Sequence, residues 1–100
     1  MKTIASIVFL LTATFALAAL VADDPEEIFR NAYTASQKAG KLEQNNSPAD
    51  AIKDYREAEK LLKFLREKHP DWKPKIVDYR AGRVAEALKR LAPRAEGKRL

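Results

Sequence analysis

Residues 49–68, ADAIKDYREAEKLLKFLREK, decide the fold that we expect for this chain of 100 residues. Small and apolar side chains recur in this stretch at alternating spacings of four and three, at Ala51, Tyr55, Ala58, Leu62 and Leu65. That spacing lines one face of an α-helix. Ile52, Leu61 and Phe64 widen the stripe on both flanks. We therefore expect neighbours to cover this helix on two sides.

A second helix is predicted before this stretch. Asp24 can cap free amide groups and Pro25 suits the first helical position, so we expect the helix to begin there and to run to about Glu43. Its small and apolar positions repeat the same spacing: Ile28, Ala32, Ala35, Ala39 and Leu42. Three alanines in one stripe permit a close approach to the central helix. Gly40 lies inside this helix and should weaken it by about 1 kcal/mol relative to alanine.

A third helix is predicted after the central one, from Pro74 to about Leu91. Its stripe consists of Val77, Ala81, Val84, Leu88 and Leu91. The connections between the helices are short, so consecutive helices should be antiparallel. The expected fold class is therefore all-α, with three antiparallel helices in residues 23–92 and a frayed basic tail at residues 93–100.

The two turns hold residues with predicted roles. Ser47, directly before Pro48, is expected to cap the central helix. His69 ends that helix, where a histidine typically serves as a cap or dipole partner. Trp72 is expected to pack back onto the third helix, near Ile76 or Tyr79, and stacking on a ligand is the alternative.

The first 22 residues have the layout of a secretory signal peptide. Residues 1–3, MKT, carry one positive charge, and the 18 residues from 4 to 21 carry no charged side chain. Small residues allow cleavage after Ala18 or after Ala22. An uncleaved membrane anchor is the alternative, because an apolar run of this length can span a bilayer. In either case we expect the remainder to be exported, and so periplasmic or secreted.

Composition narrows the possibilities further. The chain contains no cysteine, so its stability must come from helix packing or from association. The net charge is +5, and it is unevenly spread. Residues 23–59 hold nine acids and five bases, whereas residues 60–100 hold five acids and thirteen bases. This asymmetry predicts an acidic end and a basic end, of which the basic one could steer an acidic partner or a second copy, unless the charges form only a solvated surface.

Several of these positions match a known pattern. Ala39 and Leu42 lie late in the first helix, and Ala51, Tyr55 and Ala58 follow in the second. This pattern resembles a tetratricopeptide repeat. In that family the first helix carries a small residue followed by a larger apolar one, and the second helix carries alanine, an aromatic residue and alanine. The third helix resembles the start of a further repeat. The resemblance implies an exported bacterial protein with right-handed helix stacking and these packing positions: Ala39, Leu42, Ala51, Tyr55, Ala58, Ala81 and Val84.

The chain also departs from that family. Its offset of 42 residues exceeds the usual repeat of about 34, because the central helix continues past Lys63 to Pro70. Ala35 stands where the family has a large aromatic residue. About one and a half repeats are present, and solenoids usually need about three. We therefore expect a partner to complete the outer face of the third helix or the alanine-lined face of the first.

The resemblance implies a non-enzymatic interaction or scaffold module that binds a peptide, a partner protein or itself. The candidate contacts surround the second turn and the third helix: Trp72, Lys73, Lys75, Tyr79, Arg80 and Arg83. For each of them, ordinary solvated surface is the competing interpretation. A further alternative is binding of a polyanion or an anionic membrane surface through the basic C-terminal half, with export arguing against DNA.

Little in the sequence favours an enzyme. There is one histidine, no cysteine, no glycine-rich phosphate loop and no set of ligands with metal spacing. We therefore predict no catalytic residues, no metal and no cofactor.

Overall fold

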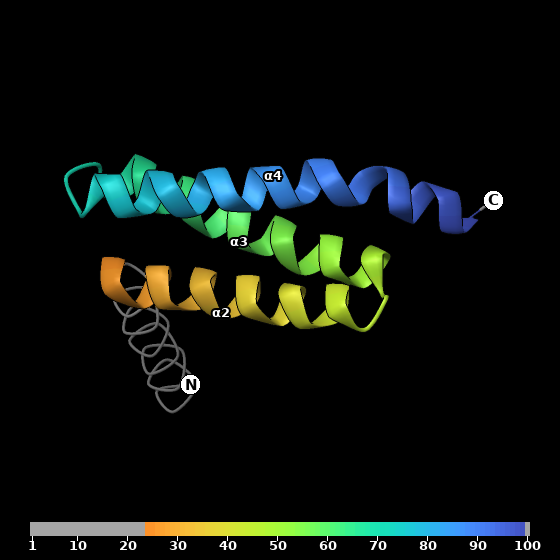
Figure 1. The fold of residues 1–100 in the computed structure, drawn as a ribbon. Helices are drawn as coiled ribbons and strands as arrows, with labels where there is room; N and C mark the ends of the chain where they lie inside the picture. The colour runs from red at the N-terminus through yellow and green to blue at the C-terminus, as the bar shows by residue number, and fades with distance from the viewer. Residues whose placement is uncertain (1–23, 100) are drawn as a thin grey trace, which may run out of the picture.

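The computed structural model describes residues 24–99, and this part of the chain forms three helices and no strand. They are α2 (Pro25–Gln44), α3 (Pro48–Lys68) and α4 (Pro74–Arg99). Consecutive helices are antiparallel, and α3 packs against both of its neighbours (Figure 1). Consequently α2 and α4 run in the same direction. The expected all-α class with three helices is confirmed, while the predicted signal peptide lies outside the described residues.

The core lies where α3 faces the other two helices. Its buried side chains are Ile28, Ala32 and Ala39 from α2, Ala51, Tyr55, Ala58, Leu62 and Leu65 from α3, and Val77, Val84, Ala87 and Leu91 from α4. All five positions of the α3 stripe are buried, as its spacing predicted. Because many of these side chains are alanines, the helices can approach closely and Tyr55 supplies bulk between them. Ala87, at 4% exposure, is a core position that was not predicted.

The ends of α2 and α3 differ in how they are capped. An Asp24 carboxylate oxygen accepts a hydrogen bond from the Glu26 amide at 3.3 Å, as expected. Ser47 occupies the corresponding position before α3, but its side chain makes no capping hydrogen bond. Its carbonyl accepts from the Ala51 amide at 3.0 Å instead. Ser47 is therefore the N-cap of α3, as predicted, and it caps through its backbone carbonyl alone. In the same turn Asn46 has a φ of 61°, the left-handed geometry that asparagine tolerates.

Helix α4 is longer than predicted. It was expected to end at about Leu91 before a frayed tail, but it continues through Pro93 to Arg99. Pro93 removes one amide donor from the helix and does not remove the contacts beyond it. One Arg94 guanidinium nitrogen lies 3.7 Å from the Glu43 carboxylate, and another donates to the Asn46 side-chain oxygen at 3.5 Å. These contacts, together with the half-buried Ala95, hold the last turns against the rest of the molecule.

The positive charge follows one helix. In sequence, α4 carries eight bases and three acids, α3 six bases and five acids, and α2 three of each. The helices lie side by side along the molecule (Figure 1). The charge asymmetry thus separates one long side from the other, and the prediction of an acidic end and a basic end was wrong.

Candidate functional site

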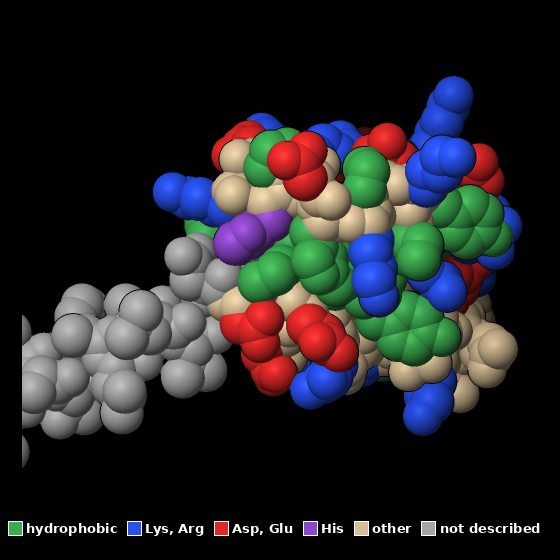
Figure 2. Space-filling model, turned by 90° about the vertical axis from the view of Figure 1, so that its left-hand side faces the viewer, with side chains coloured by type: hydrophobic (Ala, Val, Ile, Leu, Met, Phe, Trp, Pro, Cys, Tyr) green, Lys and Arg blue, Asp and Glu red, His purple; other side chains and the backbone are tan. Residues whose placement is uncertain are grey.

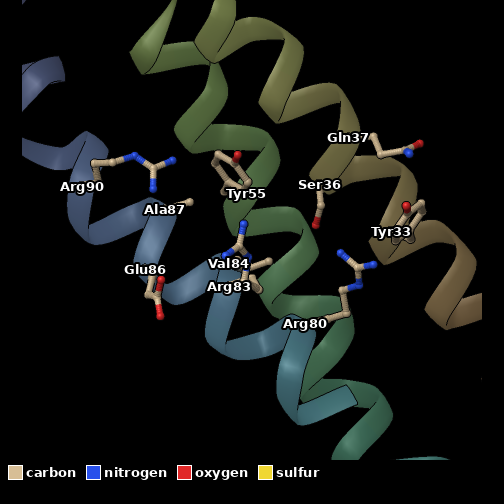
Figure 3. A pocket seen from close by; sticks show the side chains of 10 residues that line it. All are labelled: Tyr33, Ser36, Gln37, Tyr55, Arg80, Arg83, Val84, Glu86, Ala87 and Arg90. Carbon is tan, nitrogen blue, oxygen red and sulfur yellow. The ribbon is translucent and has the colours of Figure 1, made fainter. Parts of the chain in front are cut away.

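A groove runs between α2 and α4, with α3 as its floor (Figure 3). We call it the central groove, and its volume is about 210 Å³. The side chains that line it are Tyr33, Ser36, Gln37, Tyr55, Arg80, Arg83, Val84, Glu86, Ala87 and Arg90. It exists because α2 and α4 each pack on α3 rather than on each other. Gly40 of α2 lies near one of the lining side chains, since a Cβ built there would lie 3.9 Å from the Tyr55 hydroxyl.

One end of the central groove is closed by a cluster around Glu43. The Arg90 guanidinium donates to both carboxylate oxygens of Glu43, with distances from 2.8 to 3.2 Å. The Tyr55 hydroxyl donates to the same carboxylate at 3.2 Å. Burial is the main cause that raises the pKa of Tyr55, and the charge of Glu43 and the hydrogen bond to it raise it further. The hydrogen bond to Glu43 also raises the pKa of Arg90. The positive charge of Arg90 is therefore already matched within the protein.

The middle of the central groove differs, because its arginines have no carboxylate partner among the described residues. The Arg80 guanidinium points toward α2 and lies 4.6 Å from the centre of the Tyr33 ring (Figure 3). The Tyr79 ring lies 5.7 Å from the same guanidinium. Arg83, one turn further along α4, forms no ion pair within residues 24–96. Glu86 lies on the same rim without pairing with either arginine. The middle of the groove thus offers two guanidinium groups to an anion.

At the other end, the groove continues into a second depression, which we call the aromatic hollow. Its lining consists of Glu26, Phe29, Arg30, Tyr33, Trp72, Lys73 and Ile76, and its volume is about 250 Å³. The Phe29 and Trp72 rings pack together with centroids 5.5 Å apart. Tyr33 lines both depressions, so the two sites adjoin.

The position of Trp72 corrects a prediction. Its ring was expected to pack onto the third helix near Ile76 or Tyr79, but it packs on Phe29 of α2. The geometry of the turn accounts for this: the Trp72 amide donates to the His69 carbonyl at 3.0 Å, and Lys73 adopts a φ of 38°. The turn therefore folds Trp72 across the start of α2. Ile76 lines the same hollow, whereas Tyr79 is 60% exposed beside it.

The six candidate contact residues separate into three groups. Arg80 and Arg83 line the central groove, and Trp72 and Lys73 line the aromatic hollow. Lys75 and Tyr79 line neither depression. The packing positions lie in the helix contacts: Ala39, Ala51, Tyr55, Ala58 and Val84 are buried, and Leu42 and Ala81 are half-buried.

Tyr33, Gln37 and Glu43 are among the residues of the site that were not predicted from the sequence. Tyr33 and Gln37 are four residues apart on α2, a spacing that places them on one face. The sequence indicated only that this face of α2 lies beside the buried stripe of the same helix. A helix has two such flanks, however, and only the packing of α4 shows which one faces the groove.

The described residues contain no group of three acidic, histidine or cysteine side chains that could hold a metal ion. None of the described helices is long and apolar enough to cross a membrane. No match to this chain was found among protein-family models, curated proteins or solved structures.

Proposed function

We propose that this protein is an exported, non-enzymatic interaction module, which binds an extended acidic segment of a partner protein in the central groove. The observation that carries the proposal is the pair Arg80 and Arg83, which face the groove without a carboxylate partner among the described residues. A tetratricopeptide-like, right-handed arrangement of the helices belongs to the same proposal. It is supported by the residue pattern from Ala39 to Val84.

The chemistry of the groove favours a carboxylate ligand. A guanidinium presents a rigid fork of donors that matches two carboxylate oxygens. Stacking on Tyr33 limits the orientations of the Arg80 side chain, so less freedom is lost when a ligand binds. The groove is open to solvent, and each such contact should contribute only about 1 kcal/mol. We therefore expect modest affinity and ready exchange of partners.

Export is supported by the sequence of residues 1–22, with its basic start, apolar middle and small residues before Asp23. The full chain, expressed with its own leader, provides the test. We expect the protein in the exported fraction to have lost 18 or 22 residues by mass spectrometry. Recovery of the whole chain from the cytoplasm would contradict this part of the proposal.

The binding test uses the exported protein and a fluorescein-labelled dodecapeptide of glycine and serine with two adjacent central glutamates. We expect saturable binding by fluorescence anisotropy, and about fivefold weaker binding to Arg83→Gln. Arg56→Gln is the matched control, since Arg56 is exposed on α3 and lines neither depression. Equal weakening by both variants would show that net charge is the cause and would contradict binding in the groove.

A second candidate function is binding of an anionic polymer or membrane surface along α4, which the eight bases of that helix favour. Binding to such a surface should fall steeply with added salt and should weaken equally when any base on α4 is removed. Vesicles of anionic phospholipid and the glutamate peptide, compared in the same assay, distinguish the two. The second candidate would be favoured if the protein bound the vesicles more tightly than the peptide, and if Arg83→Gln and Lys89→Gln weakened vesicle binding equally.

A further inference from the structure

We propose that the bound segment carries an apolar side chain three residues away from its acidic one, and that this apolar side chain occupies the aromatic hollow. This inference rests on the proposed function, because it assigns a second contact to the same segment.

The aromatic hollow has exposed apolar surface. Ile76 is 48% exposed and Tyr33 is 36% exposed, although both are large hydrophobic residues beside the packed rings of Phe29 and Trp72. Hydrophobic side chains gather at this end of the molecule, where α2 begins and α3 turns into α4 (Figure 2). Covering such surface removes apolar area from water and favours binding.

The charges around the hollow suit an uncharged occupant. Of the charged residues that line it, Arg30 already pairs with Glu26 at 3.9 Å and with Glu27 at 3.1 Å, which leaves only the charge of Lys73. The Lys73 ammonium lies 5.3 Å from the centre of the Trp72 ring and is already placed over an aromatic face. An acidic group would bind more favourably to Arg80 and Arg83 in the adjoining groove. The two depressions therefore select different kinds of side chain.

Their separation sets the spacing in the ligand. Ile76 in the hollow and Arg83 in the groove are seven residues apart on α4, which corresponds to about 10.5 Å along the helix axis. The groove is walled by helices, whose amides and carbonyls bond within each helix, so it has no strand edge to hold a bound segment as a β-strand. In the polyproline II conformation every third side chain lies on the same face, about 9.3 Å apart. A spacing of three residues therefore spans both depressions.

The test adds a leucine to the glutamate dodecapeptide. In separate peptides the leucine lies one, three or five residues from the nearest glutamate, on either side, and serine replaces it in the reference. We expect the leucine at three residues, in at least one chain direction, to raise the affinity of the exported protein about fivefold over serine. Leucine at one or five residues should give less than half of that gain.

Variants of the protein locate the effect. Ile76→Ser should abolish the gain from leucine while leaving the binding of the serine reference peptide unchanged. Phe64→Ser is the matched control, because Phe64 is 39% exposed but lines neither depression. We expect Phe64→Ser to keep the full gain. Both side chains are partly exposed, and circular dichroism checks that both variants remain folded.

The outcomes separate this inference from the function on which it rests. If the glutamate reference peptide binds but leucine gives no gain at three residues in either direction, the spacing is wrong and the proposed function stands. Equal gains at all spacings, or a gain that survives in Ile76→Ser, would also overturn the inference. If no glutamate peptide binds, both fail. Displacement of bound peptide as the protein concentration rises would indicate that a second copy fills the groove, and would likewise overturn it.

Discussion

Glu43 joins the three helices at the level of single residues. It lies near the end of α2, accepts a hydrogen bond from Tyr55 of α3, and pairs with Arg90 and Arg94 of α4. Its side chain is 19% exposed, whereas Arg66 and Asp78, which pair across α3 and α4, are 52% and 66% exposed. Ion pairs in water contribute little, while partly buried carboxylates with several donors contribute more.

We expect Glu43→Gln to lower the free energy of unfolding by about 1 to 2 kcal/mol, because Arg90 and Tyr55 would share a neutral acceptor. Asp78→Asn, which breaks the exposed pair, should cost less than about 0.5 kcal/mol. Urea unfolding followed by circular dichroism measures both values. Equal losses of unfolding free energy in the two variants would show that the Glu43 cluster stabilises the fold no more than the exposed pair does.

The Tyr55 hydroxyl makes stability depend on pH. Burial, and then the charge and hydrogen bond of Glu43, raise its pKa in the folded protein above the ordinary value of 10.0. The folded state therefore favours the neutral hydroxyl. This contribution is complete below the pKa of the unfolded chain and is lost as the pH rises through the pKa of the folded one.

We expect the free energy of unfolding to fall above about pH 10, and to fall less steeply in Tyr55→Phe. At neutral pH that variant should lose about 1 kcal/mol, since the ring stays and one hydrogen bond is removed. Tyr79→Phe, which removes an exposed hydroxyl, is the matched control. Urea unfolding at neutral and alkaline pH provides the comparison, and identical slopes in the two variants would contradict the assignment to Tyr55.

Among the elements, α2 is the helix with the clearest weak position. Gly40 lies in its interior with ordinary helical geometry, since no glycine in the described residues has a positive φ. A Cβ at this position would meet only the Tyr55 hydroxyl, at a van der Waals distance of 3.9 Å. Nothing in the packing therefore requires glycine there, and the cost of its flexibility remains.

We expect Gly40→Ala to raise the free energy of unfolding by about 0.5 to 1 kcal/mol. Gly82→Ala on α4 is the matched comparison, because a Cβ there would meet nothing within 4 Å. Both gains should be similar in urea unfolding. A loss at Gly40 alone would show that the contact with Tyr55 is tighter than ordinary van der Waals packing.

At the scale of the whole molecule, the buried hydrophobic side chains of the described part all come from the contacts among the three helices. The large hydrophobic side chains left exposed in the described part are Tyr33, Phe64, Ile76 and Tyr79. They do not form one continuous apolar face, because Phe64 lines neither the groove nor the hollow. This distribution gives little surface for a stable dimer.

We expect the exported protein to be a helical monomer whose mass, measured by light scattering, does not change with concentration. The helical signal in circular dichroism should survive dilution. A dimer that dissociates and unfolds on dilution would mean that a second copy completes the core. The central groove would then be a self-association surface, and an acidic foreign segment would no longer be its expected occupant.

Local chemistry in the sequence was enough to predict the three helices, most of their ends and the buried stripe of α3. Spacing of three and four places side chains on one face of a helix whatever surrounds it, and the Asp24 cap is likewise a local interaction. The end of α4 and the partner of Trp72 depended instead on distant segments, on Glu43 and Asn46 in one case and on Phe29 in the other. The residues of the site likewise separate into those that the sequence predicted and those that depended on distant segments. Arg80 and Arg83 were predictable as bases at the surface of the third helix, but only the tertiary structure sets them on the groove shared with Tyr33. The flank of α2 that faces α4 is decided by how both helices pack on α3.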